Sequence, residues 1–162
     1  MSKPYKFIIV TSNSCFHCTR FKKEILSSLQ DSIIKKGNIE IIHINIERFD
    51  FPSKGYPKGL KNLVQWYPTF ILIPSKYWEN IEEGIKTETI FVFNGKYNNE
   101  GYAMLLEKRR SITLEELLKW IDENIQNLQS IQSKQRIQVK TESEKKIVKK
   151  TNNSIKFIDR IL

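Results

Sequence analysis

The chain has 162 residues, 40% of them hydrophobic, and carries 27 lysines and arginines against 18 acidic residues. This length suits one domain with a substantial core and is too short for two, and no apolar run approaches the roughly 20 residues that a bilayer span needs. The formal net charge of +9 is uneven, because residues 130–162 hold nine basic and three acidic side chains. We therefore expect a domain over residues 1–129, followed by a basic C-terminal extension over residues 130–162 that is disordered or partly helical.

The start of the chain leads directly into a strand-like run and shows no small-residue cleavage site. It therefore predicts a cytoplasmic protein. The bias toward Ile, Asn and Lys would fit a parasite or a large DNA virus, and for a virus the location would be the host cytoplasm or the virion.

The two cysteines stand together in one Cys-x-x-Cys motif at the start of a predicted helix. The apolar run Phe7–Thr11 predicts a buried strand, and Ser12–Ser14 predicts a turn that ends in a helix-capping residue. Cys15 would then lie in the first helical turn, where unpaired backbone N–H groups and the helix dipole favour a thiolate. Cys18, one turn further on, could attack a mixed disulfide formed at Cys15. The motif indicates thiol chemistry, with a pair of buried inert thiols as the alternative.

The first half of the domain predicts a β-α-β unit. Apolar residues recur at helical spacing over residues 15–35, and Gly37-Asn38 stops the helix. Residues 40–47 are rich in β-branched side chains and predict a strand. Strand, helix and strand within about 45 residues imply a parallel pair with a right-handed crossover.

The middle of the chain predicts an irregular connection and then a strand. Residues 48–59 contain two prolines and two glycines, and a short helix near Leu60–Val64 must end before Pro68. Pro68 stands at the head of an apolar strand over residues 67–73. A loop follows over residues 74–84.

The end of the domain predicts a strand and a long helix. Residues 87–93 alternate as a strand, and strands this close in the chain are expected to be antiparallel neighbours. Asn94-Gly95 is a strong turn signal. A short helix is expected around Ala103–Glu107, and Thr113–Glu116 has the spacing of a capping box. The helix that it opens carries apolar residues on one side, at Leu114, Leu117, Leu118, Ile121, Ile125 and Leu128.

This element order, with Cys-x-x-Cys after the first strand and Tyr67-Pro68-Thr69 at the head of the third, resembles the thioredoxin superfamily over about residues 5–128. The resemblance implies an α/β fold with a central mixed sheet of about four strands flanked by helices. It also implies a redox-active Cys15–Cys18 disulfide without another cofactor, and a cis Tyr67–Pro68 peptide against that disulfide. Phe93–Lys96 is similar to the family's aromatic-x-Gly turn.

The resemblance implies a thiol–disulfide oxidoreductase that acts on protein disulfides or dithiols and is recycled by a reductase or a thiol oxidase. We expect Cys15 to be the nucleophile and Cys18 to resolve the mixed disulfide. Pro68 would remove a backbone N–H near the sulfurs, and the Tyr67 backbone could pair with an extended substrate segment. The expected substrate-binding residues are Trp66, Tyr67, Pro68 and Thr69. An apolar rim would form from Phe16, Trp66 and Tyr67, unless Trp66 is a core residue.

Three positions depart from the thioredoxin pattern. Phe16-His17 replaces Gly-Pro between the cysteines and resembles the oxidising bacterial members. An imidazolium at His17 would favour the thiolate and make the disulfide a stronger oxidant, whereas a merely exposed His17 would have little effect. Ile9 stands where thioredoxin has a buried acid. His43, at the position of that acid's lysine partner, is either a substitute proton acceptor for Cys18 or a satisfied core histidine.

A glutathione-dependent reductase is the first alternative. Glutaredoxins hold glutathione with a Thr-Val-Pro segment and a later Gly-Gly-x-Asp, whereas this chain has Trp66-Tyr67-Pro68 and no Gly-Gly after its fourth strand. These differences disfavour glutathione as a dedicated substrate.

Non-catalytic binding is the second alternative. Cys15, His17, Cys18 and His43 are the only soft metal ligands, and their spacing is poor for one tetrahedral ion, so a metal would have to be shared across a dimer. The basic extension could bind nucleic acid or an anionic membrane surface. It could equally be solvated, or fold back through its apolar residues Ile155, Phe157, Ile158 and Leu162.

Overall fold

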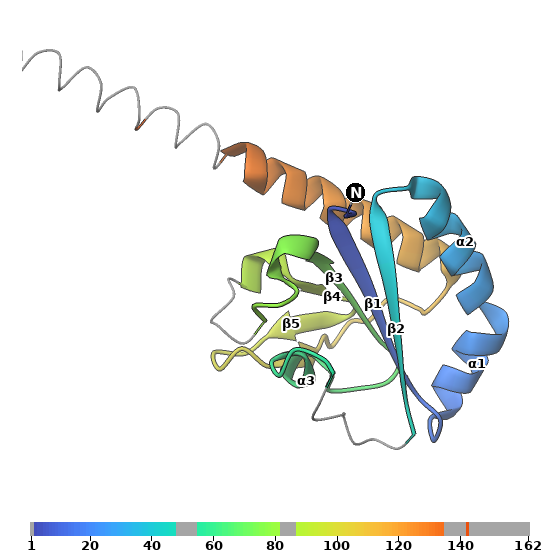
Figure 1. Ribbon diagram of the computed structural model, residues 1–162. Coiled ribbons are helices and arrows are strands. Elements are labelled where there is room, and N and C mark those ends of the chain that lie inside the picture. Colours follow the sequence, from blue (N-terminus) through green and yellow to red (C-terminus); the bar gives the residue numbers. More distant parts are fainter. Residues whose placement is uncertain (1, 48–54, 82–86, 135–141, 143–162) are drawn as a thin grey trace, which may run out of the picture. The chain divides into compact units, whose positions relative to one another are not determined.

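The computed structural model describes residues 2–47, 55–81, 87–134 and 142 (Figure 1). The chain divides into a first unit over Met1–Asn124 and a second over Ile125–Leu162. Most of the predicted extension lies outside the described residues, as does the greater part of the predicted connection over residues 48–59. In the described part of the chain, no helix has the length and apolar composition needed to cross a membrane.

A four-stranded mixed sheet forms the centre of the first unit (Figure 1). Its strands lie in the order β2-β1-β3-β4, with bounds β1 (Tyr5–Ser12), β2 (Ile39–Ile46), β3 (Thr69–Pro74) and β4 (Phe91–Val92). The β1–β2 pair is parallel, whereas the β1–β3 and β3–β4 pairs are antiparallel. The predicted parallel β-α-β unit and the predicted mixed α/β sheet are confirmed.

Side chains that alternate along the strands cover both faces of this sheet. On one face, Phe70 of β3 packs edge-on against Phe21, with ring centroids 4.9 Å apart. The same face carries Phe93 and Trp120, whose ring centroids are 5.5 Å apart. On the other face, Ile71 belongs to a cluster of buried aliphatic residues that includes Ile8, Val10, Leu60, Leu63 and Ile73. All six residues of β3 are buried, so the strand headed by Pro68 lies at the centre of the fold.

The connection between β1 and β2 consists of two helices, α1 (Phe16–Glu24) and α2 (Leu26–Lys36). The prediction of one continuous helix over residues 15–35 is wrong at Ile25, whose φ of −125° lies outside the helical region. The backbone N–H of Ile25 still donates to the carbonyl of Phe21, and the carbonyl of Ile25 still accepts from the backbone N–H of Leu29. The break therefore leaves the apolar spacing intact, which is why the sequence pattern does not reveal it. Gly37, with φ +77°, ends α2 as predicted.

The short helix α3 (Leu60–Leu63) forms where it is expected. A 3-10 turn, η1 (Ser75–Tyr77), follows β3. The predicted strand over residues 87–93 is shortened to β4, because its first half forms the 3-10 turn η2 (Thr87–Thr89).

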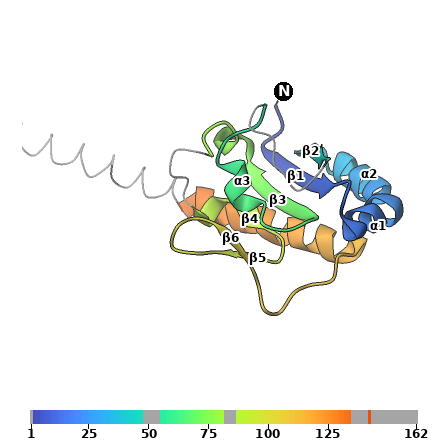
Figure 2. The same cartoon turned by 90° about the horizontal axis from the view of Figure 1, so that it is seen from below.

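The expected helix around Ala103–Glu107 is wrong. β6 (Ala103–Leu105) instead pairs antiparallel with β5 (Gly95–Tyr97), and Figure 2 shows the two strands side by side. Three strand residues are too few to establish an alternating pattern, so the local apolar content was misread as helical.

Residues 114–124 of the first unit are helical and begin at the predicted capping box. Thr113 Oγ1 accepts a hydrogen bond from the backbone N–H of Glu116 at 3.2 Å, which satisfies one of the donors left open by the first turn. In the second unit, residues 125–134 are helical.

Candidate functional site

Cys15 lies where β1 ends and α1 begins. It occupies the N-cap position with an extended backbone, φ −105° and ψ 117°. Its Sγ accepts a hydrogen bond from the backbone N–H of Cys18 at 3.2 Å. The sulfur therefore takes the place of a capping oxygen and faces the positive end of the helix. The predicted cap at Ser14 is wrong by one residue, because Cys15 itself is the N-cap.

Cys18 is more shielded than Cys15. The residue is 0% exposed, against 9% for Cys15, and both are free thiols. The backbone N–H of Ser12 donates to Cys18 Sγ at 3.4 Å. Burial, reinforced by the hydrogen bond with Cys15, raises the pKa of the Cys18 thiol to about 12. Both cysteines are thus buried, but Cys15 keeps a small exposed fraction whereas the thiol of Cys18 is enclosed and holds its proton.

The segment Trp66–Thr69 brings a third element to the thiol pair. The Tyr67–Pro68 peptide is cis. The Cys15 thiol faces the carbonyl oxygen of Tyr67, with the sulfur 3.7 Å from that oxygen. Buried Thr69 donates its hydroxyl hydrogen to the carbonyl of Trp66 and so fixes the turn before β3. Residues 52 positions apart in the sequence, Cys15 and Tyr67, therefore meet at this site, as the resemblance implies.

The predicted apolar rim is only partly assembled. Phe16 is 78% exposed and projects from the start of α1. Trp66 is half-buried and packs against the core cluster. A Cβ on Gly95 would lie 3.1 Å from the Trp66 ring, so glycine permits this close approach. Trp66 therefore contributes to the core, and Phe16 is the freely accessible aromatic at the site.

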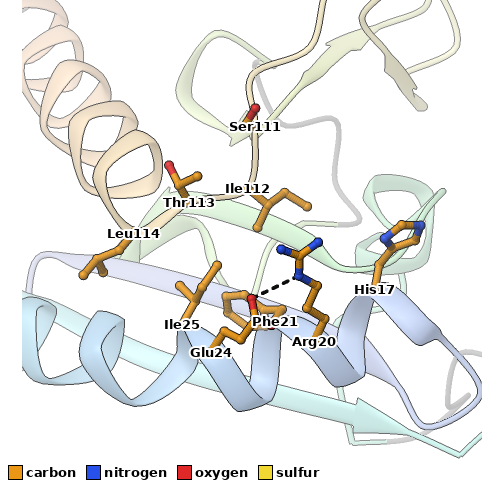
Figure 3. Close-up of a pocket in the computed structure, with 9 residues that line it drawn as sticks. All are labelled: His17, Arg20, Phe21, Glu24, Ile25, Ser111, Ile112, Thr113 and Leu114. Carbon is orange, nitrogen blue, oxygen red and sulfur yellow. Dashed lines mark hydrogen bonds and ion pairs between the residues drawn. The ribbon is translucent and has the colours of Figure 1, made fainter.

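His17 is exposed, and its ring meets the edge of the Phe16 ring at a centroid distance of 5.9 Å. It also lines a cavity of about 620 Å³ between α1 and residues 111–114 (Figure 3). In this cavity the exposed pair Arg20–Glu24 lies along α1, with Nε of Arg20 3.0 Å from a carboxylate oxygen of Glu24.

His43 is half-buried on β2, and its Nε2 lies 2.9 Å from Thr11 Oγ1. The Thr11 hydroxyl in turn donates to Asn45 Oδ1 at 2.8 Å. Burial, with a contribution from the positive charge of Lys22, lowers the pKa of His43. This geometry matches the alternative that His43 is a structural residue, since its imidazole is hydrogen-bonded to the Thr11 hydroxyl.

A lysine that the sequence reasoning missed lies next to the site. Lys22 Nζ donates to Asn13 Oδ1 at 3.3 Å and to Asn45 Oδ1 at 3.2 Å. Asn45 Nδ2 also donates to Asn13 Oδ1, at 2.8 Å. The held ammonium group favours the thiolate of Cys18 and so opposes the effect of burial on that pKa. In the sequence, the spacing of Lys22 is the signal that could have identified it, because a residue four positions after Cys18 lies on the same helix face.

Ile9, at the position of the family's buried acid, is fully buried in the core. No group of three or more potential metal ligands comes together within the described ranges. No protein family, curated protein or solved structure matches this chain.

Proposed function

We propose that this protein is a thioredoxin-like thiol–disulfide oxidoreductase that acts on protein disulfides or dithiols. The observation that carries the proposal is the placement of Cys15 Sγ between the Cys18 amide and the Tyr67 carbonyl. The order of the sheet, with β3 antiparallel to β1 and headed by Pro68, is consistent with the thioredoxin-like fold.

In the reducing direction, the Cys15 thiolate attacks one sulfur of a substrate disulfide. A Cys15–substrate bond forms, the substrate S–S bond breaks, and the other substrate sulfur leaves as a thiolate that takes a proton from water. Cys18 then loses its proton and attacks Cys15 Sγ, which releases the second substrate thiol. The substrate gains two electrons, and the protein is left with a Cys15–Cys18 disulfide. A reductase would restore the dithiol, whereas a thiol oxidase would drive the reverse reaction.

The unequal burial of the two sulfurs supports this division of labour. Cys15 is the sulfur that a large substrate can reach, because it lies at the start of α1 beside exposed Phe16. Cys18 is fully buried and keeps its proton, so it reacts only with a partner that is already attached to Cys15.

Cysteine substitutions test the proposal directly. We expect Cys15→Ser to abolish both insulin-disulfide reduction and the oxidation of a reduced peptide, because it removes the attacking sulfur. Cys18→Ser should retain the attack and accumulate covalent adducts that a reducing agent releases. The matched control is Ser28→Ala, an exposed position on α2. Full turnover by the Cys15→Ser protein would refute the proposal.

A further inference from the structure

The outer face of the β5–β6 hairpin exposes large apolar side chains. Tyr102, Met104 and Leu106 are 40%, 47% and 37% exposed, whereas Ala103 between them is 3% exposed and belongs to the core cluster. Lys96, opposite Met104 on β5, is also exposed. Ala103 therefore packs on the core, whereas Leu105, on the same side of β6, is 41% exposed. The other side of β6 presents an apolar row to solvent, which is typical of an interaction surface.

β6 also has a free backbone edge. The backbone N–H of Leu106 donates to the carbonyl of Asn94 at 2.8 Å, and the carbonyl of Tyr102 accepts from the backbone N–H of Asn98 at 3.0 Å. Tyr102 and Leu106 therefore direct these backbone groups toward the side of β5. In an antiparallel pair the intervening residues turn their N–H and C=O groups to the opposite side. Within the described part of the chain, β5 is the one strand that pairs with β6. An edge of this kind can accept another strand.

We propose that two copies of this chain pair through β6 in an antiparallel, two-fold arrangement centred on Met104. Each copy would supply the same surface, and the two hairpins would form one four-stranded sheet. The pairing would exchange hydrogen bonds between Ala103 and the partner's Leu105, and place the apolar row of each copy beside that of the other.

The occupant is a second copy because the outer face is complementary to itself. With Met104 on the two-fold axis, Tyr102 lies opposite the partner's Leu106. Exposed Glu100, in the turn before β6, then comes near the partner's Lys108, in the bend after β6. A shift by two residues in one direction would set Glu100 against Leu106. The opposite shift would set it against Arg110, whose Nη2 already lies 3.0 Å from Glu123. The central register is thus the one that matches apolar groups with apolar groups and an acid with a free base.

A cysteine cross-link tests the register. Residues directly opposite at a non-hydrogen-bonded position have Cβ atoms about 4.5–5.5 Å apart, which is close to the spacing of a disulfide. In full-length chain carrying Cys15→Ser and Cys18→Ser, we expect Met104→Cys to give covalent dimers on mild oxidation. The matched control is Ile34→Cys in the same background, because Ile34 is an exposed apolar residue of α2. It should give no covalent dimer.

Charge reversal tests the pairing without cross-linking. Glu100→Lys alone and Lys108→Glu alone should each raise the dimer dissociation constant about tenfold at low salt, because the two-fold axis repeats each charge pair. The double variant Glu100→Lys/Lys108→Glu should return it to the starting value. Sedimentation equilibrium on the full chain measures the constant, and circular dichroism checks that each variant is folded.

The outcomes are decisive in both directions. A chain that sediments as a monomer throughout, or a dimer indifferent to both charge reversals, would overturn the proposal. So would equal cross-linking at Met104→Cys and Ile34→Cys. Restoration by the double variant, together with cross-linking confined to Met104→Cys, would establish β6 pairing whatever the outcome for the redox activity.

Discussion

The proton on Cys18 links the redox site to the stability of the fold. Burial raises its pKa from an ordinary 9.0 to about 12. A raised pKa in the folded state gives stability that is present below the unfolded value and is lost as pH rises toward the folded value. Burial also raises the pKa of Tyr97, so both groups act in the same alkaline direction.

We therefore expect the reduced protein to lose stability between about pH 9 and about pH 12. Urea unfolding in the presence of a reducing agent measures this slope. The Cys18→Ala protein should show a shallower decline than the starting protein, and Tyr97→Phe should remove a separate part of the same decline. A slope that is identical with and without Cys18 would contradict the assigned protonation.

Lys22 offers a second test at single-residue scale. Lys22→Met removes the ammonium group that favours the Cys18 thiolate, so the pKa of Cys18 should rise further and mixed disulfides should persist roughly three- to tenfold longer near neutral pH. The pKa of His43 should also rise, because the same charge lowers it. Stopped-flow resolution of a preformed mixed disulfide and NMR titration of His43 report the two effects.

Lys23→Met is the matched control for Lys22, since Lys23 is its exposed neighbour on α1. It removes one positive charge from the same helix without touching Asn13 or Asn45. Equal effects from the two substitutions would mean that net charge, not the held ammonium, sets the rate of resolution.

At the scale of the element, the proposed redox activity predicts a role for the first turn of α1. Replacing Phe16-His17 with Gly-Pro should make the reduction potential more negative, because it removes an imidazolium that would stabilise the reduced form. Equilibration with a glutathione buffer measures the potential. A potential that stays constant or becomes less negative would exclude this role for His17.

The elements also show which features the sequence could and could not predict. The stop at Gly37 and the box at Thr113 are set by local backbone chemistry, so the sequence predicts both. The start of α1 is predicted to within one residue, because the cap is Cys15 and not Ser14. The break at Ile25 keeps the helical spacing, and β6 is too short to display a period. The Lys22 network depends on Asn13 and Asn45, which come together only when β1 and β2 pair.

At the scale of the whole molecule, charge separates the domain from its extension. Residues 130–162 carry a net charge of +6 and residues 1–129 carry +3. The extension has a single aromatic residue, Phe157, and acids interrupt its lysines, so we expect only weak, non-specific binding to DNA. The full chain and a chain ending at Gln129 should elute from immobilised DNA at similar salt concentrations. Much later elution of the full chain would instead indicate a nucleic-acid-binding segment.

Because Cys18 is more deeply buried than Cys15, the rate at which Cys18 is chemically labelled reports local unfolding around α1. In the reduced native chain an alkylating reagent should modify Cys15 rapidly and leave Cys18 untouched. The reagent can reach Cys18 only when α1 separates from β1. The rate of Cys18 labelling therefore measures how often the native state opens locally. Mass spectrometry of the doubly labelled fraction over time would follow these excursions without any added probe.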